Sequence, residues 1–291
     1  MSAQFLQLLF SGITVGATYA LAALGFTLIY NASNVINFAQ GEFIMLGGML
    51  TVFFIHTGLP MPLAVALAIV LPAGVGILIE KLAIQPAKGA EVVALIIITI
   101  GASLLIRGLA QVFFGKGSFG LEPFSSHAPI DIGGAVLLPQ SLWVLAVTAL
   151  VVVMLWLFFS RTVMGKAIRA TSCNPLAAQL VGIDVHWVLL LSYALSAALG
   201  AIGGILLTPL TMTSYDVGIM LGLKGFVAAV VGGLGSGLGA VLGGLLVGII
   251  EAMSAGYLSS AYKDAVPFVL IFIILFFLPR GLMGAKATER V

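Results

Sequence analysis

The sequence predicts an all-α, polytopic membrane protein, because three features exclude a water-soluble fold. Charged residues make up 8% of the chain, whereas soluble domains carry about 25%. Hydrophobic residues make up 61%, and the mean hydropathy is +1.23. Apolar stretches of about 20 residues, enough for a helix to cross a bilayer, recur from Phe5 to Pro279.

Windowing the hydropathy divides the chain into nine candidate membrane segments. They lie at residues 5–30, 38–56, 61–79, 92–114, 140–159, 187–209, 218–234, 237–258 and 265–279. Segment 218–234 is short and runs into a cluster of glycines, so it is a candidate for a broken or re-entrant helix. We therefore expect eight or nine crossings in a single transmembrane domain, residues 1–291, with no soluble domain and no internal repeat.

Basic residues indicate the orientation, because cytoplasmic loops of membrane proteins carry an excess of Lys and Arg. If loop 160–186 is cytoplasmic and the segments alternate outward from it, eight basic residues fall on the cytoplasmic side and two outside. The cytoplasmic eight are Lys81, Lys88, Arg161, Lys166, Arg169, Arg280, Lys286 and Arg290, and the outer two are Lys116 and Lys263. Nine crossings then place the N-terminus outside and the C-terminus inside.

Glycines recur four residues apart in two of the segments. Gly12 and Gly16 lie in the first, and Gly244 and Gly248 lie in the eighth. Residues four apart share one face of a helix, and small residues there let two helices approach closely in lipid. We expect these stripes to serve helix packing; a translocation path lined by backbone is the alternative.

The loop from about 160 to 186 contains a predicted short helix. Asn174 is a candidate N-cap, Pro175 suits the first helical position, and Gly182 suits a left-handed C-terminal residue. Leu176 and Leu180 would share one face of this helix, which is too short to be stable alone. That face must be covered either by the membrane surface and the protein's own helix ends or by a groove on a cytoplasmic partner.

Ionisable residues inside the segments are candidates for the translocation path, since charge is costly in lipid. The candidates are Glu42, Arg107 and Glu251, and the polar residues Asn37 and Gln40 lie beside Glu42. Lys224, inside segment 218–234, is expected to be structural, through ion pairing or by reaching the membrane surface. Structural ion pairing is the alternative for each charged residue. The lone Cys173 and three scattered histidines form no recognisable motif, so we expect no catalytic residues, no metal site and no nucleic-acid partner.

Six stretches of the chain resemble one family in order along nearly its whole length. The family is the LivH-type permeases, the membrane subunits of ABC importers for branched-chain amino acids and related compounds. The first of the six is the loop, which is similar to the cytoplasmic coupling segment of these permeases at Gly165, Arg169, Ala170, Asn174, Pro175, Ala177, Ala178, Gly182 and Ile183. The others are Asn34 to Gly47, Glu80 to Lys88, Ala94 to Gly108, Gly222 to Ala252 and Leu278 to Gly284. One departure is Leu176, which stands before Ala177 and Ala178 where the classical coupling motif has a glutamate.

The resemblance implies a larger complex in the bacterial inner (plasma) membrane, with this chain as a multi-pass permease domain. The implied partners are a second homologous permease, two cytoplasmic ABC ATPase subunits and a periplasmic solute-binding protein. This chain is expected to bind no cofactor, and ATP would be used by the partner subunits. The sequence agrees, because Gly115-Lys116 and Gly165-Lys166 both lack the remainder of a P-loop.

An ion-coupled secondary transporter of a small solute is the alternative function. It would share the composition and the broken helices, and it would use carboxylates buried in the membrane. Glu42 and Glu251 keep this alternative open.

Overall fold

Helices form nearly all of the regular structure in the computed structural model, which describes residues 2–87, 89–125 and 128–284. Lys88, Lys286 and Arg290, used above for orientation, lie outside the described residues. The first half comprises α1 Ser2–Ser33, α2 Gln40–His56, α3 Met61–Ile79, the π-helical turn η1 Glu80–Ile84, α4 Val92–Phe114, β1 Ile130–Ile132, β2 Ala135–Leu137 and α5 Pro139–Arg161. The second comprises α6 Val163–Cys173, α7 Pro175–Leu180, α8 Val185–Thr211, α9 Val217–Gly232, α10 Gly237–Tyr257, the short 3₁₀ turn η2 Ser260–Tyr262 and α11 Val266–Phe277.

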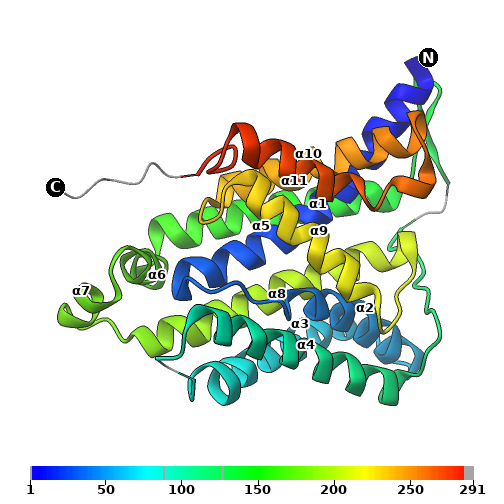
Figure 1. The fold of residues 1–291 in the computed structure, drawn as a ribbon. Helices are drawn as coiled ribbons and strands as arrows, with labels where there is room; N and C mark the ends of the chain where they lie inside the picture. Colours follow the sequence, from blue (N-terminus) through cyan, green and yellow to red (C-terminus); the bar gives the residue numbers. More distant parts are fainter. Residues whose placement is uncertain (1, 88, 126–127, 285–291) are drawn as a thin grey trace.

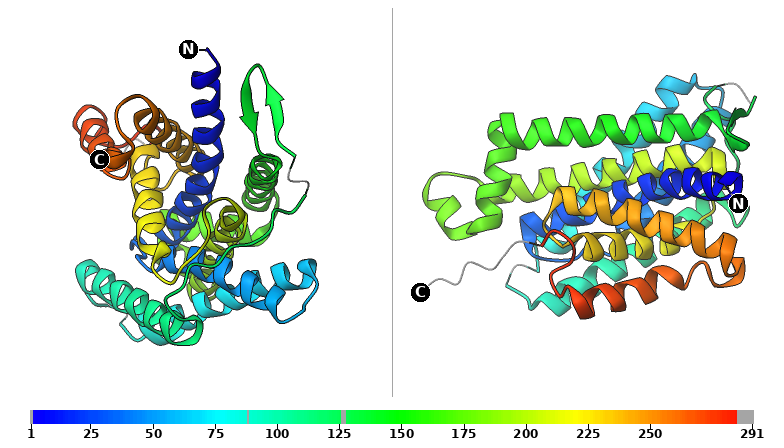
Figure 2. Two further views of the ribbon diagram at one scale, coloured as in Figure 1. Left: turned by 90° about the vertical axis from the view of Figure 1, so that its right-hand side faces the viewer. Right: turned by 90° about the horizontal axis from the view of Figure 1, so that it is seen from above.

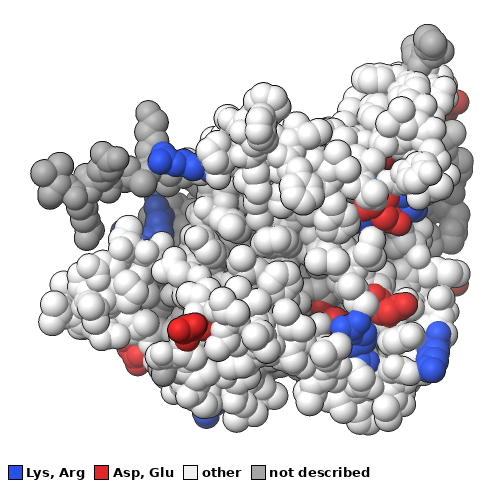
Figure 3. All heavy atoms as spheres, in the orientation of Figure 1, with Lys and Arg blue, Asp and Glu red and all other residues white. Residues whose placement is uncertain are grey.

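The predicted membrane segments correspond to nine of these helices. Six helices in the described part of the chain are long and apolar enough to cross a membrane, and α2, α9 and α11 are shorter apolar helices. Helix α1 starts at the end of the bundle that carries the β-hairpin, and α6 and α7 lie at the opposite end (Figure 1). Charged side chains gather toward these two ends of the drawn face, with an uncharged band between them (Figure 3). That band has the character of a surface in contact with lipid.

Helix α1 lies at the centre of the bundle and packs on α8, α9 and α10 (Figure 2). Its contact with α10 depends on the predicted glycine stripes. A Cβ added to Gly16 would lie 2.9 Å from the carbonyl oxygen of Gly244, and one added to Gly12 would lie 2.7 Å from the Cα of Ile249. The stripes therefore serve close helix packing.

A non-helical segment inside the bundle precedes α2. Residues 34–39 connect α1 to α2, and within them Val35, Asn37 and Ala39 are buried. Such backbone is tolerated at membrane depth only where protein surrounds it. The Phe38 N–H is satisfied from outside the segment, by Thr99 Oγ1 of α4 at 3.1 Å. The segment 218–234, a candidate for a broken or re-entrant helix, is by contrast helical without a break as far as Gly232, in α9.

The helix contacts reveal an inverted structural repeat, called here the inverted correspondence: two sets of four helices pack in the same way but run in opposite directions. The sequence suggested no repeat. Helices α1 to α4 match α8 to α11: α1 packs on α9 and α10, and α8 packs on the corresponding α2 and α3. Within each set the second helix contacts the third and the fourth. Helices α1 and α8 run in opposite directions (Figure 1), as in inverted-topology transporters. The correspondence lies in helix packing and leaves no visible trace in the amino-acid pattern.

The hairpin β1–β2 is a small departure from the predicted all-α fold. Residues 115–139 lie between the predicted membrane segments, and within them Ile130 to Ile132 pair with Ala135 to Leu137. Gly133 and Gly134 have φ of +64° and +82°, which a two-residue hairpin turn requires and which glycine adopts without strain. Gln7 of α1 holds the hairpin through hydrogen bonds with the Val136 backbone. The strands are too short for an alternating pattern to stand out in the sequence.

Gly204 of α8 provides a test of this packing, because a Cβ there would overlap the carbonyl oxygen of Ile44 in α2. We expect Gly204→Ala to destabilise the protein by about 1–3 kcal/mol through overpacking. Gly101 of α4 has no heavy atom within 4 Å of its added Cβ, so Gly101→Ala is a matched control with no such cost. Unfolding of the purified protein in mixed micelles measures both, and equal stabilities would contradict the packing argument.

Candidate functional site

The short helix α7 is held at both ends by its own sequence, as predicted. The Ala177 N–H donates to Asn174 Oδ1 at 3.1 Å, and Pro175 occupies the first helical position. At the other end Gly182 has φ of +85°. The N–H groups of Gly182 and Ile183 donate to the carbonyls of Gln179 and Ala178, both at 3.0 Å, which is a Schellman motif. Both capping predictions are confirmed.

Helix α6 joins α7 to the end of α5 through contacts of predicted coupling residues. A Cβ at Gly165 would overlap the Phe158 carbonyl, so only glycine permits this approach. The Arg169 guanidinium donates to the carbonyl oxygen of Phe159. The half-buried Ala170 accepts from the Asn174 N–H at 3.1 Å, which links α6 directly to the cap of α7.

Helix α7 turns its small side chain inward and its large apolar side chains outward. Ala178 is 3% exposed, whereas Leu176, Leu180 and Val181 are 73%, 89% and 77% exposed. Leu176 and Leu180 therefore share an exposed apolar face, as expected. The protein's own helix ends do not bury this face. Ala177 is also exposed, so of the two alanines among the predicted coupling residues of α7 only Ala178 is buried.

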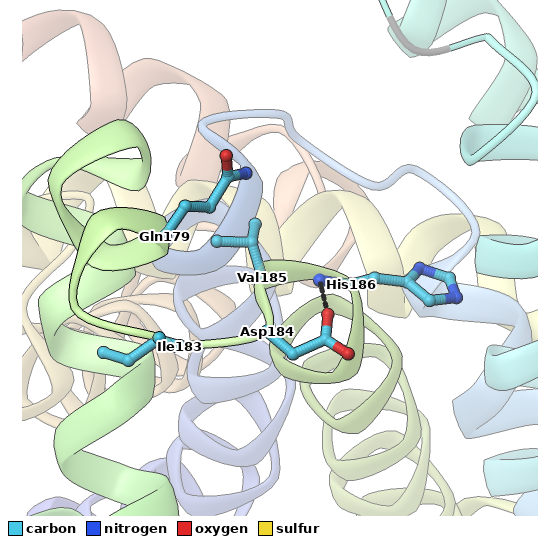
Figure 4. A pocket seen from close by; sticks show the side chains of 6 residues that line it. Gln179, Ile183, Asp184, Val185 and His186 are labelled. Atoms are coloured by element: carbon cyan, nitrogen blue, oxygen red, sulfur yellow. Dashed lines mark hydrogen bonds between the residues drawn. The ribbon is translucent and has the colours of Figure 1, made fainter.

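A concavity of about 580 Å³ lies where α7 meets α8 and includes Gly182 and Ile183 (Figure 4). Asp184 lines it and caps α8, accepting from the His186 N–H at 2.9 Å. The His186 side chain points away from Gln179, and its Nδ1 lies 3.6 Å from Glu80 Oε1 of η1. The start of α8 is thus connected to the end of α3.

Glu42 is buried near the start of α2, in a group drawn from α2 and α4. Ser103 Oγ donates to Glu42 Oε1 at 2.8 Å, and Arg107 Nε lies 3.7 Å from the same oxygen. Glu42 Oε2 has no hydrogen-bond partner among the described residues and faces Gly218 in the first turn of α9. Asn37 is also fully buried; its Oδ1 accepts from the Ala39 N–H, while its Nδ2 is unpaired within the described chain. Unpaired buried polar atoms are rare and call for an explanation.

Gln40 has a different environment, because both ends of its amide are occupied. Its Nε2 donates to the Ser196 carbonyl at 3.0 Å, and its Oε1 accepts from Ser196 Oγ at 2.6 Å. Ser196 Oγ also lies 2.8 Å from the Gly25 carbonyl. Gln40 therefore joins α1, α2 and α8 at their crossing, and it does not belong to the Glu42 group.

Glu251 belongs to a separate ionic cluster with Lys224, Asp264 and Tyr19. Lys224 Nζ donates to Glu251 Oε1 at 2.7 Å and to Asp264 Oδ1 at 2.6 Å. Tyr19 Oη donates to Glu251 Oε2 at 3.0 Å. Both carboxylate oxygens of Glu251 are thus used. The hydrogen bond from Lys224 holds the pKa of Asp264, in the loop before α11, below its ordinary value.

Several residues of these groups were not singled out from the sequence. Ser103 and Ser196 contact Glu42 and Gln40 from 61 and 156 positions away, and Asp264 contacts Lys224 from 40 positions away, so no local pattern connects the partners. The only available signal was the cost of burying Lys224, which implies a carboxylate partner. Among the described residues no three His, Cys, Asp or Glu are grouped so that they could hold a metal ion.

The cluster predicts unequal effects for its two carboxylates. Glu251→Gln leaves the buried Lys224 with one partner, and we expect it to lower the free energy of unfolding by about 3 kcal/mol. Asp264 has a half-exposed side chain, so Asp264→Asn is expected to cost less than about 1 kcal/mol. Because the pKa of Asp264 is lowered, its contribution is complete at neutral pH and is lost only as the pH falls through that lowered pKa. Micellar unfolding measurements at neutral and acid pH test both statements, and a larger effect for Asp264→Asn would contradict them.

The comparison with known proteins covers nearly the whole chain. The family model described as "Branched-chain amino acid transport system / permease component" matches residues 8–275. The high-affinity branched-chain amino acid transport system permease protein LivH of Escherichia coli (strain K12) is 34% identical over 304 residues, 99% of this chain and 98% of LivH. The corresponding permease protein BraD of Pseudomonas aeruginosa is 35% identical over 301 residues, with the same coverage of each chain.

A relative named for a different solute matches less of the chain. The galactofuranose transporter permease protein YtfT of Escherichia coli (strain K12) is 31% identical over 258 residues, 84% of this chain and 71% of YtfT. These matches settle the family. The chain belongs to the branched-chain amino acid transport system permease family.

Proposed function

We propose that this chain is the transmembrane permease subunit of an ATP-binding-cassette importer that translocates branched-chain amino acids. The proposal rests on the match to LivH and BraD over 99% of the chain. YtfT, the permease of a galactofuranose transporter, matches a smaller share of this chain than LivH and BraD do. This difference favours an amino acid over a sugar as the solute. Transport rather than catalysis is the activity of this subunit.

The exposed face of α7 is the structural observation that carries the proposal. Leu176, Leu180 and Val181 form an apolar surface on a helix too short to be stable alone, at the end of the bundle that also holds Arg161, Lys166 and Arg169. We propose that this end is cytoplasmic and that the apolar face docks in a groove of an ATPase subunit. The N-terminus then lies in the periplasm and the C-terminus in the cytoplasm of a bacterial cell with an inner membrane.

The proposed complex contains this chain, a second homologous permease, two ABC ATPases and a periplasmic solute-binding protein. The chain binds no cofactor itself, and its partners hydrolyse the ATP. The proposed ATPase-coupling residues lie in the segment 165–183. Gly165, Arg169, Ala170, Asn174, Pro175, Ala178 and Gly182 shape it, Ala177 is exposed and Ile183 is half-buried. Closure of the ATPases would move α7 and rock the membrane helices between two access states.

For the translocation path we propose Glu42, Arg107 and Asn37. Glu42 and Asn37 each carry a buried polar atom without a partner in the described structure, and the Arg107 side chain is 22% exposed. Such atoms suit transient contact with the charged ends of an amino acid. Gln40 and Glu251 have all their hydrogen-bonding oxygens occupied, which favours a structural role for both.

Leu180→Asp tests the docking surface, since it places a charge on the most exposed apolar side chain of α7. We expect ATPase subunits to bind about thirtyfold more weakly, the loss typical of a hot-spot residue, and uptake to fall with them. Val163→Asp on α6 is a matched control, because Val163 is 83% exposed but lies outside α7. Co-purification of the ATPases and uptake by vesicles measure the effect; an unchanged complex with Leu180→Asp would disprove docking at this face.

Glu42→Gln tests the path, because it removes the negative charge and keeps the shape of the side chain. We expect uptake to fall on the order of tenfold, equivalent to about 1.4 kcal/mol in the transport barrier, while the ATPases remain bound. Glu91→Gln, at an exposed carboxylate before α4, is the control. Dissociation of the complex in Glu42→Gln would instead assign this residue a structural role.

A further inference from the structure

A second cavity, of about 440 Å³, lies between α1, α5 and α6 and the segment 235–238. It has the size of a site for a small ligand. Its walls are apolar, with Leu24 and Leu28 from α1 and Val152 and Leu155 from α5. Its other end reaches Ser160, at the end of α5, and Arg169 of α6. Neither the solute path nor the ATPase-docking face proposed above uses this cavity.

The cavity has one side open to the surface that the lipid would cover. Trp156 and Leu238 line it and are 60% and 63% exposed. Between Val152 and Ser160 it follows α5 for about 12 Å, at 1.5 Å per residue, so it extends from the loop level into the apolar layer. Tryptophan is typical of the boundary between these two levels. An occupant must therefore have a polar head and an apolar tail.

The polar end of the cavity is basic and lacks a counter-charge. No Asp or Glu lines it. Within the described chain, the ion pairs do not involve Arg161, Lys166 or Arg169. Arg169 uses one N–H group on the Phe159 carbonyl and has further donors free for an anion. A phosphate is the anion that an arginine at membrane-headgroup level would meet.

A buried hydroxyl in the cavity wall is evidence for a bound ligand that does not depend on the basic charge. Thr27 lines the cavity and is 3% exposed, and its Oγ1 has no hydrogen-bond partner among the described residues. A buried hydroxyl without a partner is costly. An ester oxygen of a bound lipid would give it one, between the charged head and the apolar chains.

We propose that this cavity binds one anionic phospholipid of the cytoplasmic leaflet, with its phosphate on Arg169 and an acyl chain against Leu28 and Leu155. The choice of leaflet rests on the orientation given under the proposed function. Arg169 belongs to the helix that leads into α7, so the bound lipid would lie directly beside the ATPase-coupling segment.

Trp156 provides a direct test in the full-length chain reconstituted into vesicles. In a Trp143→Phe, Trp187→Phe background it is the remaining tryptophan, since the chain has three. Its fluorescence is titrated with acyl-brominated phosphatidylglycerol and, separately, with phosphatidylcholine brominated at the same positions. We expect about fivefold preferential association of phosphatidylglycerol, the ratio for one basic side chain at a membrane surface. Equal quenching by the two lipids would overturn the proposal.

Two variants and a matched control separate a defined site from general surface attraction. Arg169→Gln should abolish the preference, whereas Lys166→Gln, which removes the same charge from the same helix outside the cavity wall, should retain it. Ser172→Asp adds a negative charge to the wall and should also abolish it, which keeps the test valid if Arg169→Gln does not fold. An equal loss with Lys166→Gln would overturn the site. The measurement needs neither ATP nor solute, so its failure and a failure of the proposed transport function are separate results.

Discussion

Backbone contact between the glycines of α1 and α10 is the interaction on which the rest of the structure depends. Apolar side chains gain little by meeting in lipid, so helices there are held by close packing and by polar contacts. Gly12 and Gly16 bring α1 against the backbone of α10, which leaves α1 buried along most of its length. With α1 fixed at the centre, the short helices α2 and α9 can cross near Gly41 and Gly218, where the backbones are again in contact. Val35, Asn37 and Ala39 of the segment 34–39 are then buried in protein, as non-helical backbone in a membrane requires.

The inverted correspondence between α1–α4 and α8–α11 extends to the charges, with the signs exchanged. In the first set a carboxylate, Glu42, lies on the second helix and pairs with Arg107 on the fourth. In the second set a cation, Lys224, lies on the second helix and pairs with Asp264 just before the fourth. Each short helix is thereby attached to the outermost helix of its own set. The two pairs differ in completeness, because Lys224 also holds Glu251, while Glu42 keeps one oxygen unpaired in the described structure. This difference makes the first set the better candidate for function and the second for stability.

Features that depend on residues close together in the sequence could be predicted from it, and features that depend on contacts between distant segments could not. The caps of α7 were predictable because Asn174, Pro175 and Gly182 act on backbone within a few residues of themselves. The apolar segments were predictable for the same reason. The partners of Glu42 and Lys224 were not, since they come from other helices, and neither was the inward position of Ala178, which depends on how α6 and α8 hold α7. The inverted correspondence was missed because it lies in the order and crossings of the helices and needs no matching residues.

Helix α7 is joined covalently to the membrane helices on both sides, and the two connections differ in how extensively the helix they lead to is packed in the bundle. One route leads back through α6 to α5, which touches α1 and α8 over a limited length. The other leads directly into α8, which packs along α1, α2 and α3 and is connected to η1 through His186 and Glu80. Only the Schellman turn and the Asp184 cap separate α7 from α8, so under the proposed function a displacement of α7 would act on α8 directly. Helix α8 also carries Ser196, which holds Gln40 two residues before Glu42. Under the proposed function, a movement at the exposed face of α7 would reach the start of α2 through one long helix and the Gln40 amide, with no further element between the proposed coupling segment and the proposed path.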